Sequence, residues 1–401
     1  MNPLFQHRPV FFASIVAAIV ASAGCQQLPP EADSPTICAD CTVTTTPEEG
    51  TAKAPSVWRE AHWNELPGWD TDDLGAAWPA FLESCRAIGS KPDWAAVCAA
   101  ASALPEKLSD QEARRFFEQH FTPRQSVASN GSVQGLVTGY YEPLIYGSRM
   151  QLPGAQWPIL APPNDMLTAN NVHRHPELRS MNLRGRLDGK KVVPYWTRAE
   201  LEKRRAEGKL PARALFWAAD PIDLFFLQIQ GSGQVELTDG TRVRVGFAEH
   251  NGHPYRSIGS WLVERGELSL HQASMEGIRQ WALRNPQRLN ELLNSNPRYV
   301  FFRELPLGEG GPIGALGVPL HAERSIAVDR TYVPLGAPVF LSTTWPLSDK
   351  PLNRLVMAQD TGGAIKGAVR VDYFWGFGDG AGEQAGKMRQ QGNIWVLWPK
   401  K

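Results

Sequence analysis

The spacing of apolar residues is helical in the part of the chain that follows residue 55. An amphipathic helix is predicted there, although Pro79 inside the run indicates a kink or a later start. Its apolar positions are Leu74, Trp78, Phe81, Leu82 and Cys85. A second helix is expected from Pro92 to about Ala103, and a capping box of Ser109 and Glu112 predicts a third. The N-terminal body is therefore predicted to be helical.

From Gly135 on, β-branched and aromatic residues form short clusters that Gly and Pro interrupt, which is typical of β-strands. The expected strands are Gly135–Tyr146, Val192–Trp196, Phe225–Gln230, Gln234–Leu237 and Thr241–Phe247. Helical spacing returns in Ser274–Arg284 and Pro286–Leu293, and after Gly317 the pattern is again that of strands. Because strands and helices are segregated, barrel-like β units are favoured over a doubly wound sheet.

Length and charge narrow the class of protein. A chain of 401 residues is long enough for two domains and a leader. Lys plus Arg and Asp plus Glu both total 41, so the chain offers no mean attraction for a polyanion, and nucleic acid is not an expected partner. The 14 Trp residues suit a sugar polymer, whose rings stack on aromatic planes, although any one Trp is more often a core residue.

The N-terminal residues have the pattern of an export signal. His7 and Arg8 precede an apolar run from Val10 to Ala23, which is too short for a membrane span. Small residues lead directly to Cys25, as in a lipoprotein cleavage box. We therefore expect a signal peptide at residues 1–24, a lipid on Cys25 and attachment to the periplasmic face of the outer membrane. Plain secretion with cleavage nearby is the alternative. Residues 25–55 are rich in Pro, Thr, Ala and Glu and are expected to form a flexible tether.

The other cysteines fall into two pairs. Cys38 and Cys41 lie in the tether, where a lone pair is weak support for zinc, and a local disulfide or no bond is favoured. Cys85 and Cys98 lie in two predicted helices of an exported protein, so a disulfide between them is expected, with two buried thiols as the alternative. No metal or other cofactor is expected, because the segment Glu249–His253 lacks a third defined ligand.

Candidate chemistry is densest between Ala358 and Gly378, where Asp360 and Asp372 lie among clustered glycines. Cleavage of a glycosidic bond needs an acid for the leaving oxygen and, in most enzymes, a second carboxylate. The alternative is that both aspartates form turns. Asp360 also begins the Asp-Thr-Gly signature of aspartic proteases, but the sequence holds no second copy, which disfavours that reading.

Two upstream segments have side chains that suit acetamido sugars. Thr138–Pro143 combines a hydroxyl group, two Tyr residues and an acid. Gln228–Gly233 places amides on alternate positions of an expected strand beside a flexible turn. Each segment alone is weak support, because paired Tyr residues in a strand usually serve packing.

These motifs together resemble one known family. They are similar, in this order, to motifs of the membrane-bound lytic murein transglycosylase A family. The similarity begins at Trp69 and continues through Thr138–Pro143, Phe225–Gly233, His250–Gly259, Val318–Leu320 and Gly363–Gly367 with Asp372. The resemblance implies a mainly β protein with α decoration. It implies a double-psi β-barrel domain from residues 56–143 and 309–401, with a smaller β-barrel-like domain at 144–308 inserted and a glycan groove between the two.

The resemblance also implies a site and a reaction. Asp372 would be the catalytic residue and Asp360 a second acid in the same pocket. The groove would be lined by Thr138, Gly139, Tyr140, Tyr141, Gln230, Gly231, Ser232, Gly363 and Lys366. The implied reaction cuts the β-1,4 bond between N-acetylmuramic acid and N-acetylglucosamine and leaves a 1,6-anhydromuramic acid end.

Such chemistry requires the pKa of Asp372 to be raised, by burial or by the charge of Asp360. The expected partner is the peptidoglycan glycan strand, and a role in a cell-wall synthesis complex stays open. A glycan hydrolase that uses Asp360 and Asp372 as a pair, and a peptidoglycan-binding lipoprotein without activity, are the alternatives.

Overall fold

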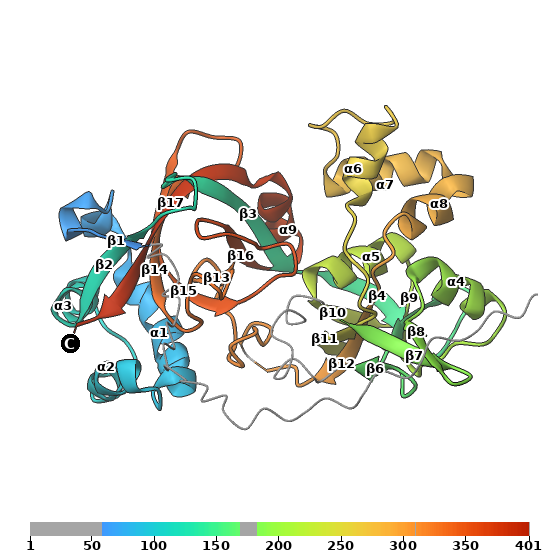
Figure 1. Cartoon of the computed structure of the whole chain (residues 1–401), viewed down its shortest axis with the longest axis horizontal. Coiled ribbons are helices and arrows are strands. Elements are labelled where there is room, and N and C mark those ends of the chain that lie inside the picture. Colours follow the sequence, from blue (N-terminus) through green and yellow to red (C-terminus); the bar gives the residue numbers. More distant parts are fainter. Residues whose placement is uncertain (1–57, 169–182, 309, 401) are drawn as a thin grey trace, which may run out of the picture. The chain divides into compact units, whose positions relative to one another are not determined.

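The computed structural model describes residues 58–168, 183–308 and 310–400, which form a mainly β structure with helices (Figure 1). The helices are α1 (Leu74–Ile88), α2 (Pro92–Ser102), α3 (Asp110–His120), α4 (Arg198–Ala206), α5 (Pro221–Gln230), α6 (Ile258–Glu264), α7 (Met275–Arg284), α8 (Leu289–Asn294) and α9 (Gly378–Lys387). Short 3-10 helices cover Trp63–Glu65, Trp69–Thr71 and Pro286–Arg288. The predicted mainly β class with α decoration is confirmed.

An eight-stranded sheet carries the candidate catalytic residues, in the order β1-β2-β17-β14-β15-β13-β16-β3. Its strands are β1 (Trp58–Glu60), β2 (Phe121–Ser126), β3 (Gly135–Glu142), β13 (Ser325–Val328), β14 (Pro338–Thr344), β15 (Pro351–Asp360), β16 (Val371–Phe377) and β17 (Arg389–Pro399). Strand β17 pairs in addition with β3. The pairings therefore close a circuit of six strands from β17 through β14, β15, β13, β16 and β3, and β2 and β1 extend from it.

A second sheet of six strands has the order β12-β11-β10-β4-β9-β5. It consists of β4 (Leu144–Ser148), β5 (Trp157–Leu160), β9 (Ala214–Ala218), β10 (Ser232–Leu237), β11 (Arg242–His250) and β12 (Val300–Leu305). A third, small sheet contains β6 (Leu167–Thr168), β7 (Arg184–Asp188) and β8 (Lys191–Pro194). The chain leaves the first sheet at Pro143, between β3 and β4, and returns to it after β12, at β13.

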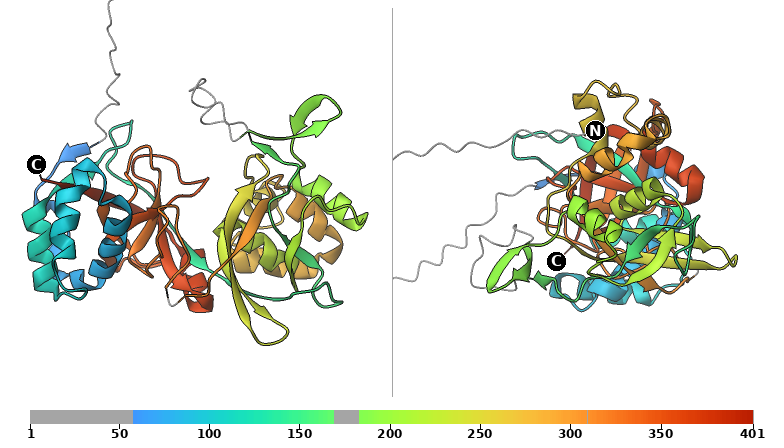
Figure 2. Two further views of the ribbon diagram at one scale, coloured as in Figure 1. Left: turned by 90° about the horizontal axis from the view of Figure 1, so that it is seen from below. Right: turned by 90° about the vertical axis from the view of Figure 1, so that its right-hand side faces the viewer.

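Helices α1 to α3 pack together beside the first sheet, and α1 contacts β15 (Figure 2). Their contact is aromatic: Trp78 of α1 lies 4.9 Å from Phe116 and 6.2 Å from Phe117 of α3, between ring centroids. The predicted capping box is present, with Ser109 as the N-cap of α3 and Glu112 at the third position. Helix α1 starts at Leu74, where the Asp73 side chain accepts a hydrogen bond from Ala76 N, and continues through Pro79.

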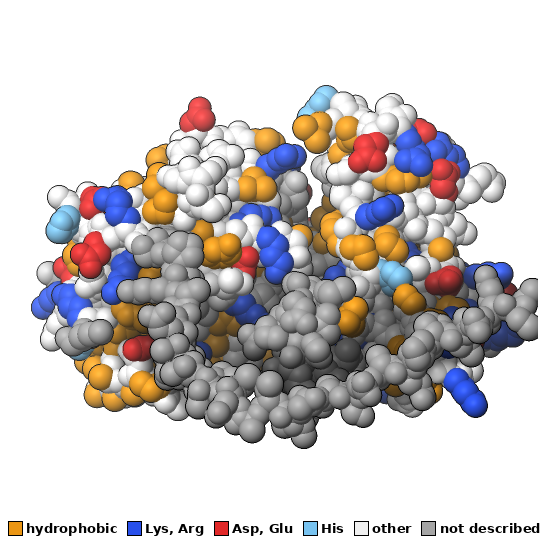
Figure 3. All heavy atoms as spheres, in the orientation of Figure 1, with side chains coloured by type: hydrophobic (Ala, Val, Ile, Leu, Met, Phe, Trp, Pro, Cys, Tyr) orange, Lys and Arg blue, Asp and Glu red, His pale blue; other side chains and the backbone are white. Residues whose placement is uncertain are grey.

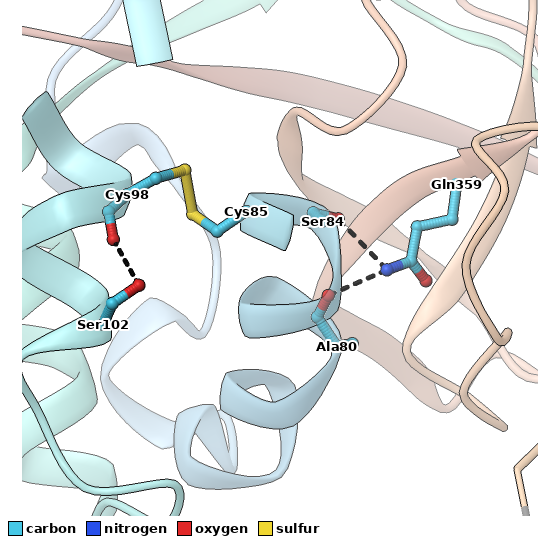
Figure 4. The surroundings of a disulfide bond; sticks show 6 residues. All are labelled: Ala80, Ser84, Cys85, Cys98, Ser102 and Gln359. Carbon is cyan, nitrogen blue, oxygen red and sulfur yellow. Dashed lines mark hydrogen bonds between the residues drawn. A yellow bond between two sulfur atoms is a disulfide. The ribbon is translucent and has the colours of Figure 1, made fainter. Parts of the chain in front are cut away.

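A disulfide joins Cys85 of α1 to Cys98 of α2, the pairing expected from the sequence (Figure 4). The other side of α1 faces the strand that ends in Asp360 (Figure 4). Gln359 Nε2 donates to the carbonyl oxygen of Ala80 (2.8 Å) and to Ser84 Oγ (3.0 Å) (Figure 4). The disulfide, helix α1 and the end of β15 are thus mechanically connected.

Several sequence-based expectations about elements are wrong. Phe225–Gln230, expected as a strand, is the second half of helix α5. Asp220 caps this helix by accepting from Ile222 N and Asp223 N, and Gly231 ends it with a φ of 82°. Its apolar residues are buried around most of the helix. The sequence therefore shows neither the 3.6-residue spacing of an amphipathic helix nor the alternation of a half-buried strand. Helices α4, α6 and α9 were not expected.

The tryptophans also differ from the composition-based expectation. All 14 lie in the described residues, and none has an exposed side chain. Six are buried outright: Trp69, Trp78, Trp94, Trp281, Trp375 and Trp395. The Trp content therefore reflects the core in the main and does not by itself indicate an exposed sugar-stacking platform.

Charges of both signs are interspersed over the face in Figure 3, as the balanced composition suggests. Within the described ranges no helix is long and apolar enough to cross a membrane. The expected signal peptide, Cys25 and the whole of the expected tether, including Cys38 and Cys41, lie outside the described residues.

Candidate active site

Asp360 and Asp372 are brought together by strand β13, which lies between β15 and β16. Ala327 of β13 is the register partner of Asp360 on one side and of Asp372 on the other. Because neighbouring strands lie about 4.8 Å apart, the two aspartates are separated by about two strand spacings. The sheet register therefore places both expected acids at one level of the circuit of strands.

Asp372 receives a hydrogen bond on one carboxylate oxygen. Thr138, its register partner on β3, donates from Oγ1 to Asp372 Oδ1 at 2.6 Å. Arg370 Nη2 donates in turn to Thr138 Oγ1 at 2.8 Å. Among the described residues no hydrogen bond reaches Asp372 Oδ2. One oxygen is thus held in place, and the other is left for a ligand.

Burial raises the pKa of Asp372 above its ordinary value of 3.8, because the ionised carboxylate loses its hydration. The hydrogen bond from Thr138 and the positive charge of Arg370 act in the opposite direction. The pKa shift that the proposed acid chemistry needs therefore has burial as its main cause. Thr138 and Arg370 make this rise in the pKa of Asp372 smaller.

Asp360 is held far more completely. Its Oδ1 accepts from Ala315 N and Thr361 N, both at 2.9 Å, and its Oδ2 accepts from the Tyr140 hydroxyl at 3.1 Å. Burial raises the pKa of Asp360 to about 6, against the lowering effect of these three hydrogen bonds, and the charge of Asp372 adds to the rise. With both oxygens engaged, Asp360 anchors a loop and a tyrosine.

The two adjacent tyrosines point to different environments. Tyr140 lies in a small cluster with Leu320, Ile365 and Phe374, and its ring centroid is 5.1 Å from that of Phe374. Burial and the two aspartates raise the pKa of Tyr140 well above its ordinary value. Tyr141 belongs instead to the large core, where its hydroxyl reaches Met275 Sδ at 3.5 Å. Of the two tyrosines, Tyr140 is therefore the one whose hydroxyl group contacts Asp360.

Four other expected groove residues lie farther from this chemistry. A Cβ on Gly139 would lie 2.6 Å from Trp375 Nε1 and 2.9 Å from Ala385 Cα of α9, so this glycine permits close packing. Gln230 Oε1 accepts from Tyr141 N at 3.2 Å. Gly231 ends α5, and Ser232, half-buried, begins β10. Within the described residues, hydrogen bonds link only Thr138 and Tyr140 of the expected groove set to the aspartates.

Gly363 and Lys366 are exposed in the segment between β15 and β16. Asp329 holds this segment, because its carboxylate accepts from Gly367 N at 3.0 Å. A second hydrogen bond, from Thr331 N at 3.1 Å, fixes the Asp329 side chain. Sequence reasoning missed Asp329 and Arg370. Arg370 could have been found, since residues two apart in a strand share a face and Asp372 follows it at that spacing.

The histidine segment also has local roles. His250 Nδ1 accepts from Gly252 N at 2.9 Å, and burial lowers the pKa of His250 to about 4. His253 Nε2 lies 2.7 Å from the carbonyl oxygen of Tyr195. Across the described ranges no group of three or more His, Cys, Asp and Glu residues is arranged to hold a metal ion.

Two family models match the chain, and their ranges include the residues of the candidate site. One, described as the MltA specific insert domain, matches residues 136–303, and the other, described as the 3D domain, matches residues 324–398. A crystal structure of MltA from Neisseria gonorrhoeae is 42% identical, covers 85% of this chain and 92% of that chain, and has a TM-score of 0.75. This chain belongs to the membrane-bound lytic murein transglycosylase A family. The predicted family is thereby confirmed.

Other members of the membrane-bound lytic murein transglycosylase A family are also similar to this chain in sequence and structure. The Escherichia coli (strain K12) protein of that name is 33% identical over 274 residues, which are 67% of this chain and 66% of that protein. The match thus spans just under two thirds of that relative's length. A structure of E. coli MltA with bound chitohexaose is 25% identical, covers 87% of this chain and 96% of that chain, and has a TM-score of 0.65. The predicted enzyme class agrees with the names of these relatives.

Proposed function

We propose that this chain is a lytic transglycosylase that cleaves the β-1,4 bond between N-acetylmuramic acid and N-acetylglucosamine in peptidoglycan, with Asp372 as both acid and base. The names of its relatives support the substrate and the reaction class. The observation that carries the choice of residue is the contrast between two half-buried carboxyl groups. Asp360 has both oxygens engaged, whereas Asp372 has Oδ2 without a partner among the described residues.

The reaction balances with one residue. Asp372 in its protonated form, which burial favours by raising its pKa, gives its proton to the glycosidic oxygen as the bond from that oxygen to C1 of the muramic acid breaks. The resulting carboxylate accepts the proton of the C6 hydroxyl group while O6 bonds to C1. The products are a 1,6-anhydromuramic acid end and an N-acetylglucosamine end with a free 4-hydroxyl group. No water is consumed, and Asp372 is again protonated.

A hydrolase that uses Asp360 as its second carboxylate is the main competing reaction. It would require Asp360 to bind water or attack C1, but three hydrogen bonds already engage both of its oxygens. We assign Asp360 the task of positioning Tyr140 and the backbone at Ala315. A chain that binds peptidoglycan without cleaving it is the third reading.

Product analysis separates these readings. Purified protein is incubated with sacculi, and the released muropeptides are identified by mass spectrometry. Anhydro ends support the transglycosylase, reducing ends support the hydrolase, and binding without release supports the third reading. Asp372→Asn should reduce release of anhydro ends by at least about 10²-fold while leaving the fold intact. Substantial release by the folded variant would move the assignment to Asp360.

We further propose that Cys25 carries a lipid that holds the protein at the periplasmic face of the outer membrane. The support is the small-residue sequence before Cys25 and the word "membrane-bound" in the names of the relatives. Cys25→Ser should abolish incorporation of labelled fatty acid, and continued labelling would show another attachment site. A role in a cell-wall synthesis complex would fit such a location, and co-purification after cross-linking in cells tests it.

A further inference from the structure

Arg298 is a half-buried cation with little compensation. Its Nη1 donates one long hydrogen bond of 3.5 Å to the carbonyl oxygen of His253, and within the described parts of the chain it forms no salt bridge. The negative charge of Glu249 favours the charged form of Arg298, but Glu249 forms its salt bridge with Arg184, at 3.0 Å. Burial lowers the pKa of Arg298, as expected for a charge that has lost water without gaining a full partner.

The backbone that carries Arg298 is fixed on both sides. Arg298 N donates to Asn296 Oδ1 at 3.2 Å, and its carbonyl oxygen accepts from Arg198 Nη2 at 2.8 Å. Arg198 is itself buried, and Tyr299 N donates to Asn251 Oδ1 at 2.9 Å. These contacts hold the main chain of Arg298, although they leave its guanidinium group weakly bonded. A cation fixed in this way is pre-organised for an external ligand.

The guanidinium group lies against Gly363, in the segment between Asp360 and Asp372. A Cβ on Gly363 would lie 3.6 Å from Nη2, 3.8 Å from Cζ and 3.9 Å from Nη1 of Arg298. Gly363 is exposed and has no side chain to cover the cation. The cation is therefore next to the backbone of the segment that leads into the candidate catalytic strand.

We propose that Arg298 binds a carboxylate carried by the lactyl arm of N-acetylmuramic acid, and this inference rests on the proposed function. The guanidinium fork matches a carboxylate in geometry and charge. In a peptidoglycan strand the lactyl arm ends either in its own free carboxylate or in a stem peptide that bears carboxylates. A strand of N-acetylglucosamine alone has neither. Arg298 would thus distinguish peptidoglycan from a neutral chitin-like strand.

The test measures binding, so that it does not depend on turnover. In the Asp372→Asn background, dissociation constants are measured for chitohexaose, for peptide-free glycan strands and for peptide-bearing strands. Arg298→Gln should weaken binding of carboxylate-bearing strands about 10-fold more than binding of chitohexaose, the size expected for a lost charge-assisted hydrogen bond. Arg298→Lys should restore part of the difference, and added salt should reduce it.

Arg256→Gln is the matched control, because Arg256 is exposed in a neighbouring segment and forms no salt bridge within the described ranges. It should leave the preference for carboxylate-bearing strands unchanged. A loss confined to peptide-bearing strands assigns the carboxylate to the stem peptide, and a loss confined to peptide-free strands assigns it to the lactyl group. Equal losses for all three ligands, or none, would overturn the proposal.

Thermal unfolding of each variant shows whether weaker binding reflects a damaged fold. The proposed function has a separate readout, because it fails if the unsubstituted protein releases no anhydro ends from sacculi. That outcome leaves the binding comparison intact. A charge-dependent preference without cleavage would then indicate a peptidoglycan-binding protein, whereas cleavage without the preference would remove only the role of Arg298.

Discussion

Thr138 donates a hydrogen bond of 2.6 Å to Asp372, although 234 positions separate the two residues in sequence. Their strands, β3 and β16, pair in parallel with these residues in register. A hydrogen bond to the ionised form of an acid lowers its pKa, whereas burial raises it. Thr138 therefore limits the pKa rise of the candidate catalytic acid.

Thr138→Val should raise the pKa of Asp372 further. Arg370, which also donates to Thr138, should stay in place because it donates to the carbonyl oxygens of Leu136 and Val371 as well. The acid must be protonated to act, so the falling limb of activity should move to higher pH in the variant. The measurement is the rate of anhydromuropeptide release across pH.

Thr138→Ser is the control, since it keeps a hydroxyl group at this position and should retain the original pH profile. A shift of the Thr138→Val profile to lower pH, or equal shifts in both variants, would contradict the account of Thr138.

Asp360 should make stability depend on pH. It ionises near its ordinary value of 3.8 in the unfolded chain and at about 6 in the fold, so the folded state binds more protons between these values. Its contribution is fully present below pH 3.8 and is lost as pH rises through about 6. Asp360→Asn removes this titration. Urea unfolding between about pH 5 and 7 should show a smaller fall in the free energy of unfolding for the variant than for the unsubstituted protein, and identical slopes would contradict the shift.

Tyr140 and Tyr141 should respond differently to loss of the hydroxyl group. Tyr140→Phe removes the hydrogen bond to Asp360 and should lower the rate of cleavage several-fold, with a loss of about 1 kcal/mol in stability. Tyr141→Phe should have nearly the same activity and stability as the unsubstituted protein, because the Tyr141 hydroxyl group reaches only Met275 Sδ within the described residues. Activity and urea unfolding are measured together. Equal effects of the two substitutions would show that the aspartate contact has no special role.

The disulfide should stabilise the N-terminal helices. Cys85 and Cys98 are 13 positions apart, and a loop of this size predicts a loss of about 2–4 kcal/mol when both are changed to Ala. A reductant should destabilise the unsubstituted protein and have no effect on the double variant. If both thiols are alkylated in denatured protein that has not been reduced, the bond is absent in solution.

The sequence was informative where local signals act alone. The Ser109 and Glu112 capping box marked the start of α3, and the β-branched cluster after Gly135 marked β3. It misled at Phe225–Gln230, where burial around most of α5 removed the amphipathic pattern. The flanking Asp220, Pro221 and Gly231 were local helix signals that the β-rich composition outweighed.

Glycine-rich α9 could not be expected, since Gly disfavours helices. It forms against β3 because Gly382 leaves room for the ring of Tyr141, which would lie 2.9 Å from a Cβ there. Such a fit depends on residues more than 200 positions away and leaves no local pattern.

For the candidate site as well, some features could be predicted from the sequence and others could not. The clustered glycines around Asp360 and Asp372 indicated a pocket, and the family resemblance implied their roles. The alignment of both aspartates on Ala327 depends on the pairing of β13 with β15 and β16. The contact of Thr138 with Asp372 depends on the pairing of β3 with β16, which the whole second sheet separates in sequence. Residue types cannot specify that register, so the division of tasks between the two acids required coordinates.

Strand β17 pairs with three others: its first residues with β3, its middle with β14 and its last with β2. A chain cut before Arg389 would expose the hydrogen-bonding edges of all three partners at once. Open edges recruit strands from other molecules. Truncation by proteolysis or a premature stop codon at that point should therefore yield aggregates that a quality-control protease removes, in place of a soluble protein of lower activity.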